Sequence, residues 1–190
     1  MPDIQAQNAI VVAQDGTVYY ERDADTEVKI ASITKIMTAI VTLENTSGSE
    51  ELTVDNRAAT VGESSAGLLE GDRLTVSDCL KALMIPSGND AALALATYVG
   101  GKIDPASSDP YATFIEAMNS TAAELGMEHT VFENPHGLDF SGWEGDFHST
   151  ARDVGNHVCP RHAKRAVPCA RERCEQDDFR DRRRWSAAFD

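Results

Sequence analysis

Residues 31–39 read Ala-Ser-Ile-Thr-Lys-Ile-Met-Thr-Ala, and this stretch decides how the rest of the chain is interpreted. It opens a segment, 32–45, in which apolar residues recur at helical spacing, so we predict a helix with one buried face. Ser32 stands where an N-cap is expected. Positions i and i+3 share a face of a helix, so the Lys35 amine can reach the Ser32 hydroxyl.

A serine and a lysine placed in this way can carry out nucleophilic chemistry. The helix N-terminus offers unpaired N–H groups and a positive dipole end, which stabilise negative charge on the Ser32 oxygen and on an oxyanion. Partial desolvation of Lys35 would lower its pKa, as a general base requires. A Ser-x-x-Lys pattern also arises about once by chance in a chain of this length. The alternative is therefore a capping serine beside a solvated lysine.

A second candidate site is the triplet Ser87-Gly-Asn89, which follows Pro86 at the junction of two predicted helices. A hydroxyl and a carboxamide two residues apart in a turn can both face a cleft, where one relays a proton and the other binds a substrate amide. The alternative is plain turn chemistry, with Asn89 capping the next helix.

The remaining elements follow from periodicity and turn signals. Asp15-Gly16 between two apolar runs predicts a β-hairpin. We expect a strand over 71–76, helices over 77–84, 89–99 and 109–125, a loop over 134–146 and a further helix capped by Ser149. Gly100-Gly101 is expected to end the helix that begins at Asn89.

Composition limits the classes of partner. The chain has 190 residues, of which 42% are hydrophobic, and a formal net charge of −14. This charge argues against nucleic acid as a partner, because phosphate binding depends on clustered Lys and Arg. No apolar run of about 18 residues predicts a membrane span in this chain. The first residues also lack the pattern of a signal peptide, so we expect either a cytoplasmic protein or a lost export signal.

Charge and cysteine content divide the chain in two. Residues 1–155 carry 8 Lys and Arg against 25 Asp and Glu, whereas residues 156–190 carry 9 against 6 and hold three of the four cysteines. We predict one domain over 5–155 and an atypical basic, Cys- and Arg-rich tail over 156–190. A frameshift near Gly155 would explain the change, and the alternative is a disordered basic tail.

Four segments together resemble the low-molecular-mass penicillin-binding proteins of the D-alanyl-D-alanine carboxypeptidase type. They are Ala31–Ala39, Pro86-Ser-Gly-Asn-Asp-Ala-Ala92, His136-Gly-Leu-Asp139 and Ser149-Thr-Ala-Arg-Asp153. The likeness covers roughly residues 5–155 in order and spacing, and it includes motifs of a serine peptidase superfamily. It implies an α/β (α+β) fold of the β-lactamase/transpeptidase-like class, with helices flanking an antiparallel sheet.

The resemblance also implies an acyl-transfer site without a cofactor or metal. Ser32 would be the nucleophile, Lys35 its base, and Ser87 the group that passes the proton to the leaving D-alanine. Asn89 would bind the peptide on the acyl side. The implied partners are a peptidoglycan stem peptide ending in D-Ala-D-Ala and β-lactams, and the implied location is the cell envelope, outside the cytoplasm.

The sequence departs from this family in one respect. No Lys-Thr-Gly or Lys-Ser-Gly triplet occurs, and the family carries this motif on a core strand beside the nucleophile. We therefore expect the C-terminal strands of the fold to be missing. An inactive fragment or a non-catalytic binding module is the alternative function. A β-lactamase is a further one, but no segment matches the glutamate that class A enzymes need.

Two other groupings of residues could carry chemistry. His136 could be the base of a triad, although in the resembling family its segment shapes a loop. Two cysteine-containing pairs, Cys159 with His162 and Cys169 with Cys174, could supply zinc ligands. No apolar pattern around them could form a small metal domain, so we predict no metal site.

Overall fold

The computed structural model describes residues 4–13 and 15–158. Along the chain the elements are β1 (Ala9–Val12), β2 (Val18–Arg22), the 3-10 helix η1 (Ala31–Ile33), α1 (Thr34–Asn45), β3 (Glu51–Thr53), α2 (Asn56–Ala59), β4 (Arg73–Thr75), α3 (Val76–Met84), α4 (Asn89–Ile103), α5 (Pro110–Glu124) and α6 (Ala151–Val158).

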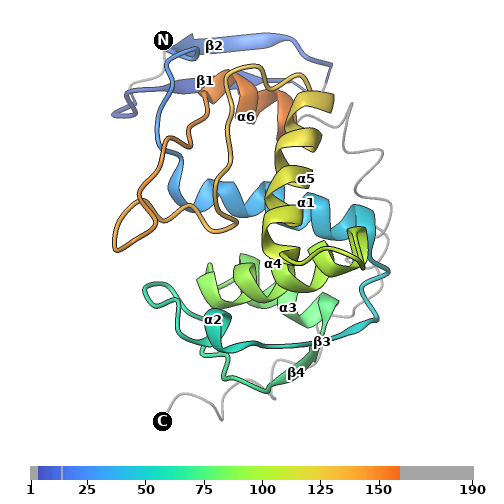
Figure 1. The fold of residues 1–190 in the computed structure, drawn as a ribbon. Helices are drawn as coiled ribbons and strands as arrows, with labels where there is room; N and C mark the ends of the chain where they lie inside the picture. Colours follow the sequence, from blue (N-terminus) through green and yellow to red (C-terminus); the bar gives the residue numbers. More distant parts are fainter. Residues whose placement is uncertain (1–3, 14, 159–190) are drawn as a thin grey trace, which may run out of the picture.

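The strands form two antiparallel pairs at opposite ends of the described chain (Figure 1). The β1–β2 hairpin lies at one end and packs against α6, and the β3–β4 pair lies at the other end beside α3. Helix α1 crosses the middle, with α4 and α5 against it. The arrangement brings the start of α1 next to the start of α4.

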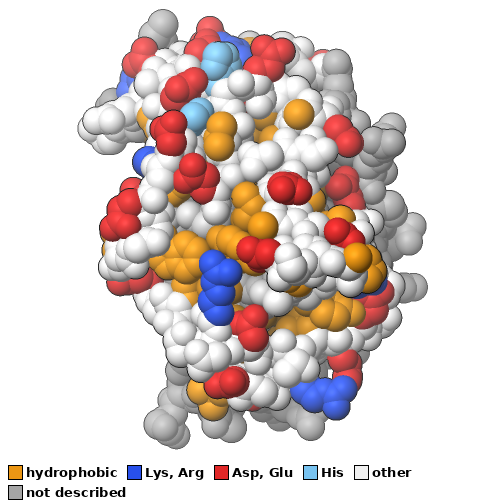
Figure 2. Space-filling view, in the orientation of Figure 1, with side chains coloured by type: hydrophobic (Ala, Val, Ile, Leu, Met, Phe, Trp, Pro, Cys, Tyr) orange, Lys and Arg blue, Asp and Glu red, His pale blue; other side chains and the backbone are white. Residues whose placement is uncertain are grey.

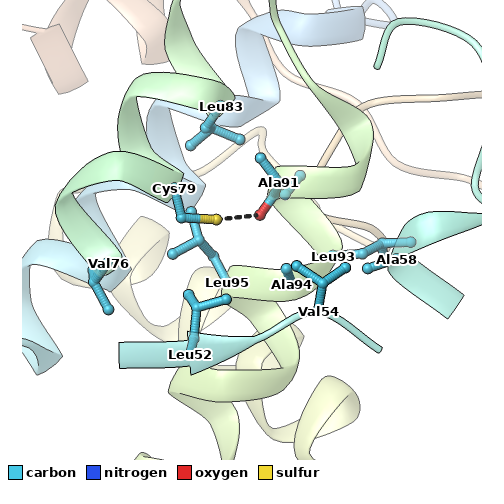
Figure 3. Close-up of a cluster of buried hydrophobic side chains, with 11 residues drawn as sticks. Leu52, Val54, Ala58, Val76, Cys79, Leu83, Ala91, Leu93, Ala94 and Leu95 are labelled. Carbon is cyan, nitrogen blue, oxygen red and sulfur yellow. Dashed lines mark hydrogen bonds between the residues drawn. The ribbon is translucent and has the colours of Figure 1, made fainter. Parts of the chain in front are cut away.

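Helix α4 is the centre of the core. Its residues Asn89–Ala96 are buried on every side, which is typical of a helix enclosed by other elements. Figure 3 shows the leucines and alanines of α4 packed against side chains of β3, α2 and α3. Cys79 of α3 lies in this cluster, and burial raises the pKa of its thiol to about 12. Its sulfur faces the Ala91 carbonyl oxygen at 3.6 Å, so this cysteine is a packing residue.

Most of the predicted elements are confirmed. The β-hairpin forms around Gly16, which has a φ of 90°, and Asp15 accepts a hydrogen bond from the Thr17 backbone N–H. Helix α5 begins after Asp109, whose side chain caps it, and Gly126 follows it with a positive φ. The segment 134–146 contains no helix or strand, as predicted.

Three predicted helix boundaries are wrong. Helix α1 begins at Thr34, and Ser32 lies before it in η1 without capping it. Helix α4 continues through Gly100 to Ile103. Thr150, rather than Ser149, occupies the cap position before α6, because its hydroxyl accepts the Asp153 backbone N–H at 3.0 Å.

Close packing explains why α4 does not end at its glycine pair. A Cβ on Gly100 would lie 1.7 Å from the Pro110 carbonyl oxygen, so this glycine lets α4 and α5 approach each other. A Cβ on neighbouring Gly101 would meet only the Pro110 ring at 3.9 Å. Gly100 therefore serves helix packing and does not end the helix.

Within the described residues no helix is both long and apolar enough to cross a bilayer, and no group of three or more His, Cys, Asp or Glu side chains is placed to hold a metal ion. The cysteine and histidine zinc candidates at 159–174 lie outside the described residues, and so does the predicted tail beyond Val158, the last residue of α6.

The two glycines give a matched test of this packing. We expect Gly100→Ala to lower the free energy of unfolding by about 2 kcal/mol or more, because α4 and α5 must separate. Gly101→Ala should instead raise it by up to about 1 kcal/mol, because alanine favours a helix and has room. Urea unfolding followed by circular dichroism measures both. Equal effects of the two substitutions would contradict the close approach.

Candidate active site

Ser32 lies on the surface at the start of the central helix. It belongs to η1, directly after Ala31, which adopts a positive φ of 45°. Such a φ is uncommon for a residue other than glycine, and it directs the chain sharply into the helix. Ser32 is exposed and its Oγ lies 3.0 Å from the Nζ of Lys35, one turn later. The predicted proximity of this serine and lysine is thus present in the structure.

Lys35 is buried although its side chain carries an amine. Only 2% of the residue is exposed, and its Nζ donates hydrogen bonds to three oxygens: Ser32 Oγ, Asn89 Oδ1 at 2.7 Å and the His136 carbonyl at 3.1 Å. Burial lowers the pKa of Lys35 to about 8, and the nearby Asp90 carboxylate opposes this shift. A measurable fraction of the amine is therefore neutral near pH 7.

Ser87 and Asn89 lie where α3 gives way to α4. Ser87 is half-buried and has a φ of 61°, another uncommon value, while Asn89 is the first residue of α4. Asn89 donates from its side chain to the Gly62 carbonyl at 3.3 Å and from its backbone to the Ser64 carbonyl at 2.8 Å. Lys35 thus links the two motifs directly through Asn89, and Ser87 lies two residues away in the same turn.

The segment around His136 closes the third side of the lysine. Besides the His136 carbonyl, the Pro135 carbonyl accepts the Thr38 hydroxyl of α1 at 2.6 Å. Asn134 folds the segment into a turn, because its Oδ1 accepts the backbone N–H groups of His136 and Gly137. The sequence did not indicate this role of the backbone.

The His136 ring has no part in the contacts of Lys35. It is 1% exposed, its Nδ1 accepts the Leu138 backbone N–H, and its edge packs on Trp143 with 4.4 Å between ring centroids. Burial, aided by the charges of Lys35 and Arg57, lowers its pKa to about 3. A neutral, enclosed ring fits a residue that shapes the loop rather than the base of a triad.

Gly137 is where this loop meets the serine turn. It has a φ of 85°, and a Cβ there would lie 1.9 Å from the Ala31 carbonyl oxygen and 2.9 Å from Thr34 Oγ1. Only glycine can adopt this conformation so near the backbone of Ala31. The His-Gly pair in the sequence was a signal for this contact, although the partner could not be read from it.

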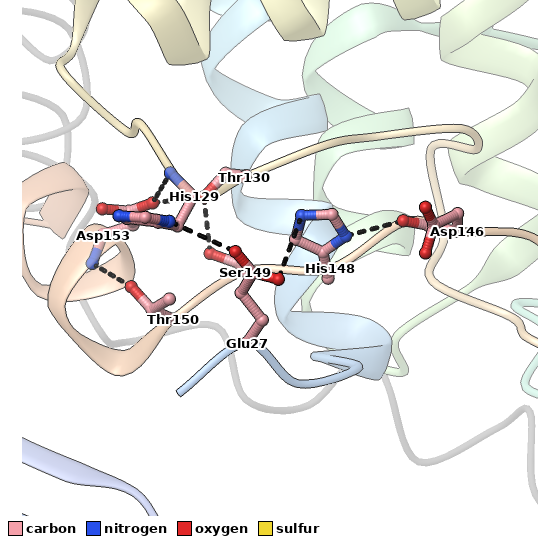
Figure 4. Close-up of polar contacts among 8 residues, drawn as sticks. All are labelled: Glu27, His129, Thr130, Asp146, His148, Ser149, Thr150 and Asp153. Carbon is pink, nitrogen blue, oxygen red and sulfur yellow. Dashed lines mark hydrogen bonds and ion pairs between the residues drawn. The ribbon is translucent and has the colours of Figure 1, made fainter. Parts of the chain in front are cut away.

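Both ends of the loop are fixed by a second polar network, shown in Figure 4. Short bridges pair Val131 with His148 and Val28 with Ser149. Asp153 of α6 accepts the His129 backbone N–H and the Thr130 hydroxyl, and Thr130 also contacts Ser149 Oγ at 2.8 Å. The segment 149–153 therefore holds the loop that supplies the third wall of the site.

The family model described as D-alanyl-D-alanine carboxypeptidase, peptidase S11, matches residues 1–178. The chain belongs to this family. The D-alanyl-D-alanine carboxypeptidase DacF of Bacillus subtilis is 33% identical over 144 residues, covering 73% of this chain and 35% of the relative. DacC of Escherichia coli is 36% identical over 165 residues, covering 80% of this chain and 38% of the relative.

Two solved structures show the same fold. The Streptomyces K15 DD-transpeptidase superposes with a TM-score of 0.74 at 32% identity, covering 85% of this chain and 62% of that one. DacD of Francisella tularensis gives a TM-score of 0.72 at 28% identity, covering 87% and 40%. The predicted β-lactamase/transpeptidase-like fold class is therefore confirmed. The chain spans between a third and two fifths of the length of the two curated relatives above.

The glycine at the meeting of the loop and the serine turn allows a matched test. We expect Gly137→Ala to move Ala31 and Ser32, because the new methyl group would overlap the Ala31 carbonyl. Gly142→Ala is the control, since Gly142 also has a positive φ, of 90°, but nothing lies within 4 Å of its Cβ position. Both lose backbone freedom, and only the first changes the site.

The measurement is the Ser32 and Lys35 backbone amide shifts in ¹H–¹⁵N spectra. Large shifts of these two amides in Gly137→Ala and small ones in Gly142→Ala are expected. Unchanged Ser32 and Lys35 signals in a folded Gly137→Ala protein would show that the loop does not position the serine.

Proposed function

We propose that this protein is a serine-type D-Ala-D-Ala carboxypeptidase that works through an acyl-enzyme on Ser32. The observation that carries the proposal is the buried Lys35 amine, held between Ser32 Oγ and Asn89 Oδ1. Membership of the S11 family supports the substrate class. Uncommon backbone conformations at Ala31 and Ser87 support the location, since such conformations gather at functional sites.

In the first step the neutral Lys35 amine takes the Ser32 proton as the serine oxygen attacks the carbonyl carbon between the two D-alanines. The bond between that carbon and the leaving nitrogen then breaks, and Ser87 relays to the departing D-alanine the proton that Lys35 took from Ser32. The negative charge that develops on the substrate oxygen lies at the start of α1, where the Ser32 backbone N–H and the helix dipole stabilise it.

Asn89 binds the acyl part of the substrate in this mechanism. Its side-chain oxygen accepts a hydrogen bond from Lys35, and its amide nitrogen donates one to the Gly62 carbonyl. A carboxamide has a second amide hydrogen, which is the group that can donate to a substrate carbonyl. Water then hydrolyses the ester on Ser32 and regenerates the serine. No step requires a metal or a cofactor.

The substrate on this proposal is a peptidoglycan stem peptide ending in D-Ala-D-Ala, which lies in the cell envelope outside the cytoplasm. β-Lactams resemble the reacting peptide bond, so they would acylate the same serine and leave slowly. The charge of the molecule suits a peptide or small molecule better than a polyanion: Figure 2 shows acidic side chains spread over the visible face, where basic ones are few.

Release of D-alanine tests the proposed function. We expect the protein to release D-alanine from an N-acylated peptide ending in D-Ala-D-Ala and to leave the same peptide ending in L-Ala-L-Ala intact. Ser32→Ala should lower the rate by about 10³-fold or more, because the nucleophile is lost. Ser49→Ala, at an exposed serine after α1, is the matched control and should keep the wild-type rate.

Equal rates for the wild type and Ser32→Ala would overturn the proposed nucleophile. Binding of the D-Ala-D-Ala peptide without any release of D-alanine would favour the alternative of a non-catalytic binding module.

A further inference from the structure

Asp90 is a buried charge that the proposed mechanism does not use. It follows Asn89 in α4, is 1% exposed, and its carboxylate accepts four hydrogen bonds. The donors are Ser65 Oγ at 2.6 Å and the backbone N–H groups of Ala66 (3.0 Å), Leu68 (3.0 Å) and Ala91 (2.9 Å). A buried carboxylate with this many donors is arranged to remain ionised.

Three of these donors come from one segment, 64–68, and this segment also contacts the Ser87–Asn89 turn. The Ser64 hydroxyl donates to the Pro86 carbonyl at 2.9 Å, and the Ser64 carbonyl accepts the Asn89 backbone N–H at 2.8 Å. A Cβ on Gly88 would lie 2.6 Å from Asp90 Oδ1, so the carboxylate also lies against the middle of the turn. Asp90 thus attaches the segment 64–68 to α4. This segment in turn contacts Pro86 and Asn89, which lie on either side of Ser87.

The charge of Asp90 also acts on Lys35. Burial alone would raise the pKa of the Asp90 carboxyl, but the hydrogen bonds from Ala66, Ser65 and Leu68 outweigh it and the pKa is lowered. Asp90 follows Asn89, whose Oδ1 lies 2.7 Å from Lys35 Nζ, and both charged residues are buried. The Asp90 carboxylate accordingly raises the pKa of Lys35 against the effect of burial. Among the described residues, Asp90 is the charged group that shifts the pKa of Lys35. The His136 ring, whose own pKa is lowered to about 3, is neutral at pH 7. Ser32 and Asn89, the remaining side-chain partners of the amine, carry no charge.

We propose that Asp90 is a positioning residue of this site, which fixes the Ser87-Gly88-Asn89 turn through residues 64–68 and stabilises the ammonium form of Lys35 by its charge. The catalytic consequence rests on the proposed function, whereas the structural claim does not. The two effects have opposite signs for catalysis, since a fixed turn favours acylation and a more basic lysine is less often neutral. Substitution of a residue with a purely structural role would change only the position of the turn and not the pKa of Lys35.

The charge is tested by titrating Lys35 directly in the whole protein. Lysines are labelled with ¹³C at Cε, and the Lys35 signal is identified by its loss in Lys35→Arg. Asp90→Asn keeps the size of the side chain and removes its charge. The Lys35 titration midpoint is expected near 8 in the wild type and lower in Asp90→Asn. Asp78→Asn, at an exposed aspartate of α3 that pairs with Lys81, is the matched control and should leave the midpoint unchanged.

The positioning is tested by hydrogen exchange of the Ala66 and Leu68 amides. Both should exchange about tenfold faster or more in Asp90→Asn, because each loses a hydrogen bond to a charged acceptor. Asp90→Glu separates the two effects: it keeps the charge near Lys35 and misplaces the acceptor, so exchange should rise while the Lys35 midpoint stays above that of Asp90→Asn.

An unchanged Lys35 midpoint in folded Asp90→Asn would overturn the electrostatic part of the proposal. Unchanged exchange of Ala66 and Leu68 in Asp90→Asn would overturn the positioning part, and if Asp90→Asn does not fold, unchanged exchange in Asp90→Glu decides the same point. Neither measurement needs a substrate. Absence of D-alanine release would therefore count against the proposed function alone.

Discussion

The burial of Lys35 is the constraint on which the rest of the site depends. Removing a charged amine from water is costly unless hydrogen bonds compensate or the amine becomes neutral. In this protein three oxygens accept from the Lys35 Nζ, and its pKa is lowered to about 8, so that the amine loses its proton more readily than an exposed lysine. The acceptors come from η1, the start of α4 and the 134–146 loop. The lysine therefore joins three segments that are far apart in sequence.

Each of these segments is held in place by different residues. The serine turn depends on Gly137, which alone allows the loop to lie against the Ala31 carbonyl. The loop depends on Asp153 and the bridges around it, and the turn before α4 depends on Asp90. Two buried carboxylates, Asp90 and Asp153, thus support the arrangement around Lys35. The supporting residues Asp90, Gly137 and Asp153 lie in the segments 86–92, 136–139 and 149–153, which also resemble the family.

The sequence predicted the part of this arrangement that follows from local rules. Helical periodicity placed Ser32 and Lys35 on one turn, and the Asp15-Gly16 signal placed the hairpin. The sequence-based prediction is wrong where a long-range contact determines the local structure. Gly100-Gly101 predicts a helix end, but the backbone of Pro110 requires a glycine inside α4. Ser32 was expected to cap α1, but the turn at Ala31 directs its hydroxyl to Lys35. The role of the His136 carbonyl had no sequence signal, because it belongs to the backbone.

The central claim is that a buried, readily neutralised Lys35 activates Ser32. The most direct measurement is the rate at which benzylpenicillin forms a covalent adduct on Ser32, followed by tandem mass spectrometry of peptides from pH 6 to pH 10. We expect a rate that rises with pH and levels off above about 8, since the amine must lose its proton to act as a base. A rate that keeps rising to pH 10 without levelling, a flat profile, or an adduct on a residue other than Ser32 would contradict it.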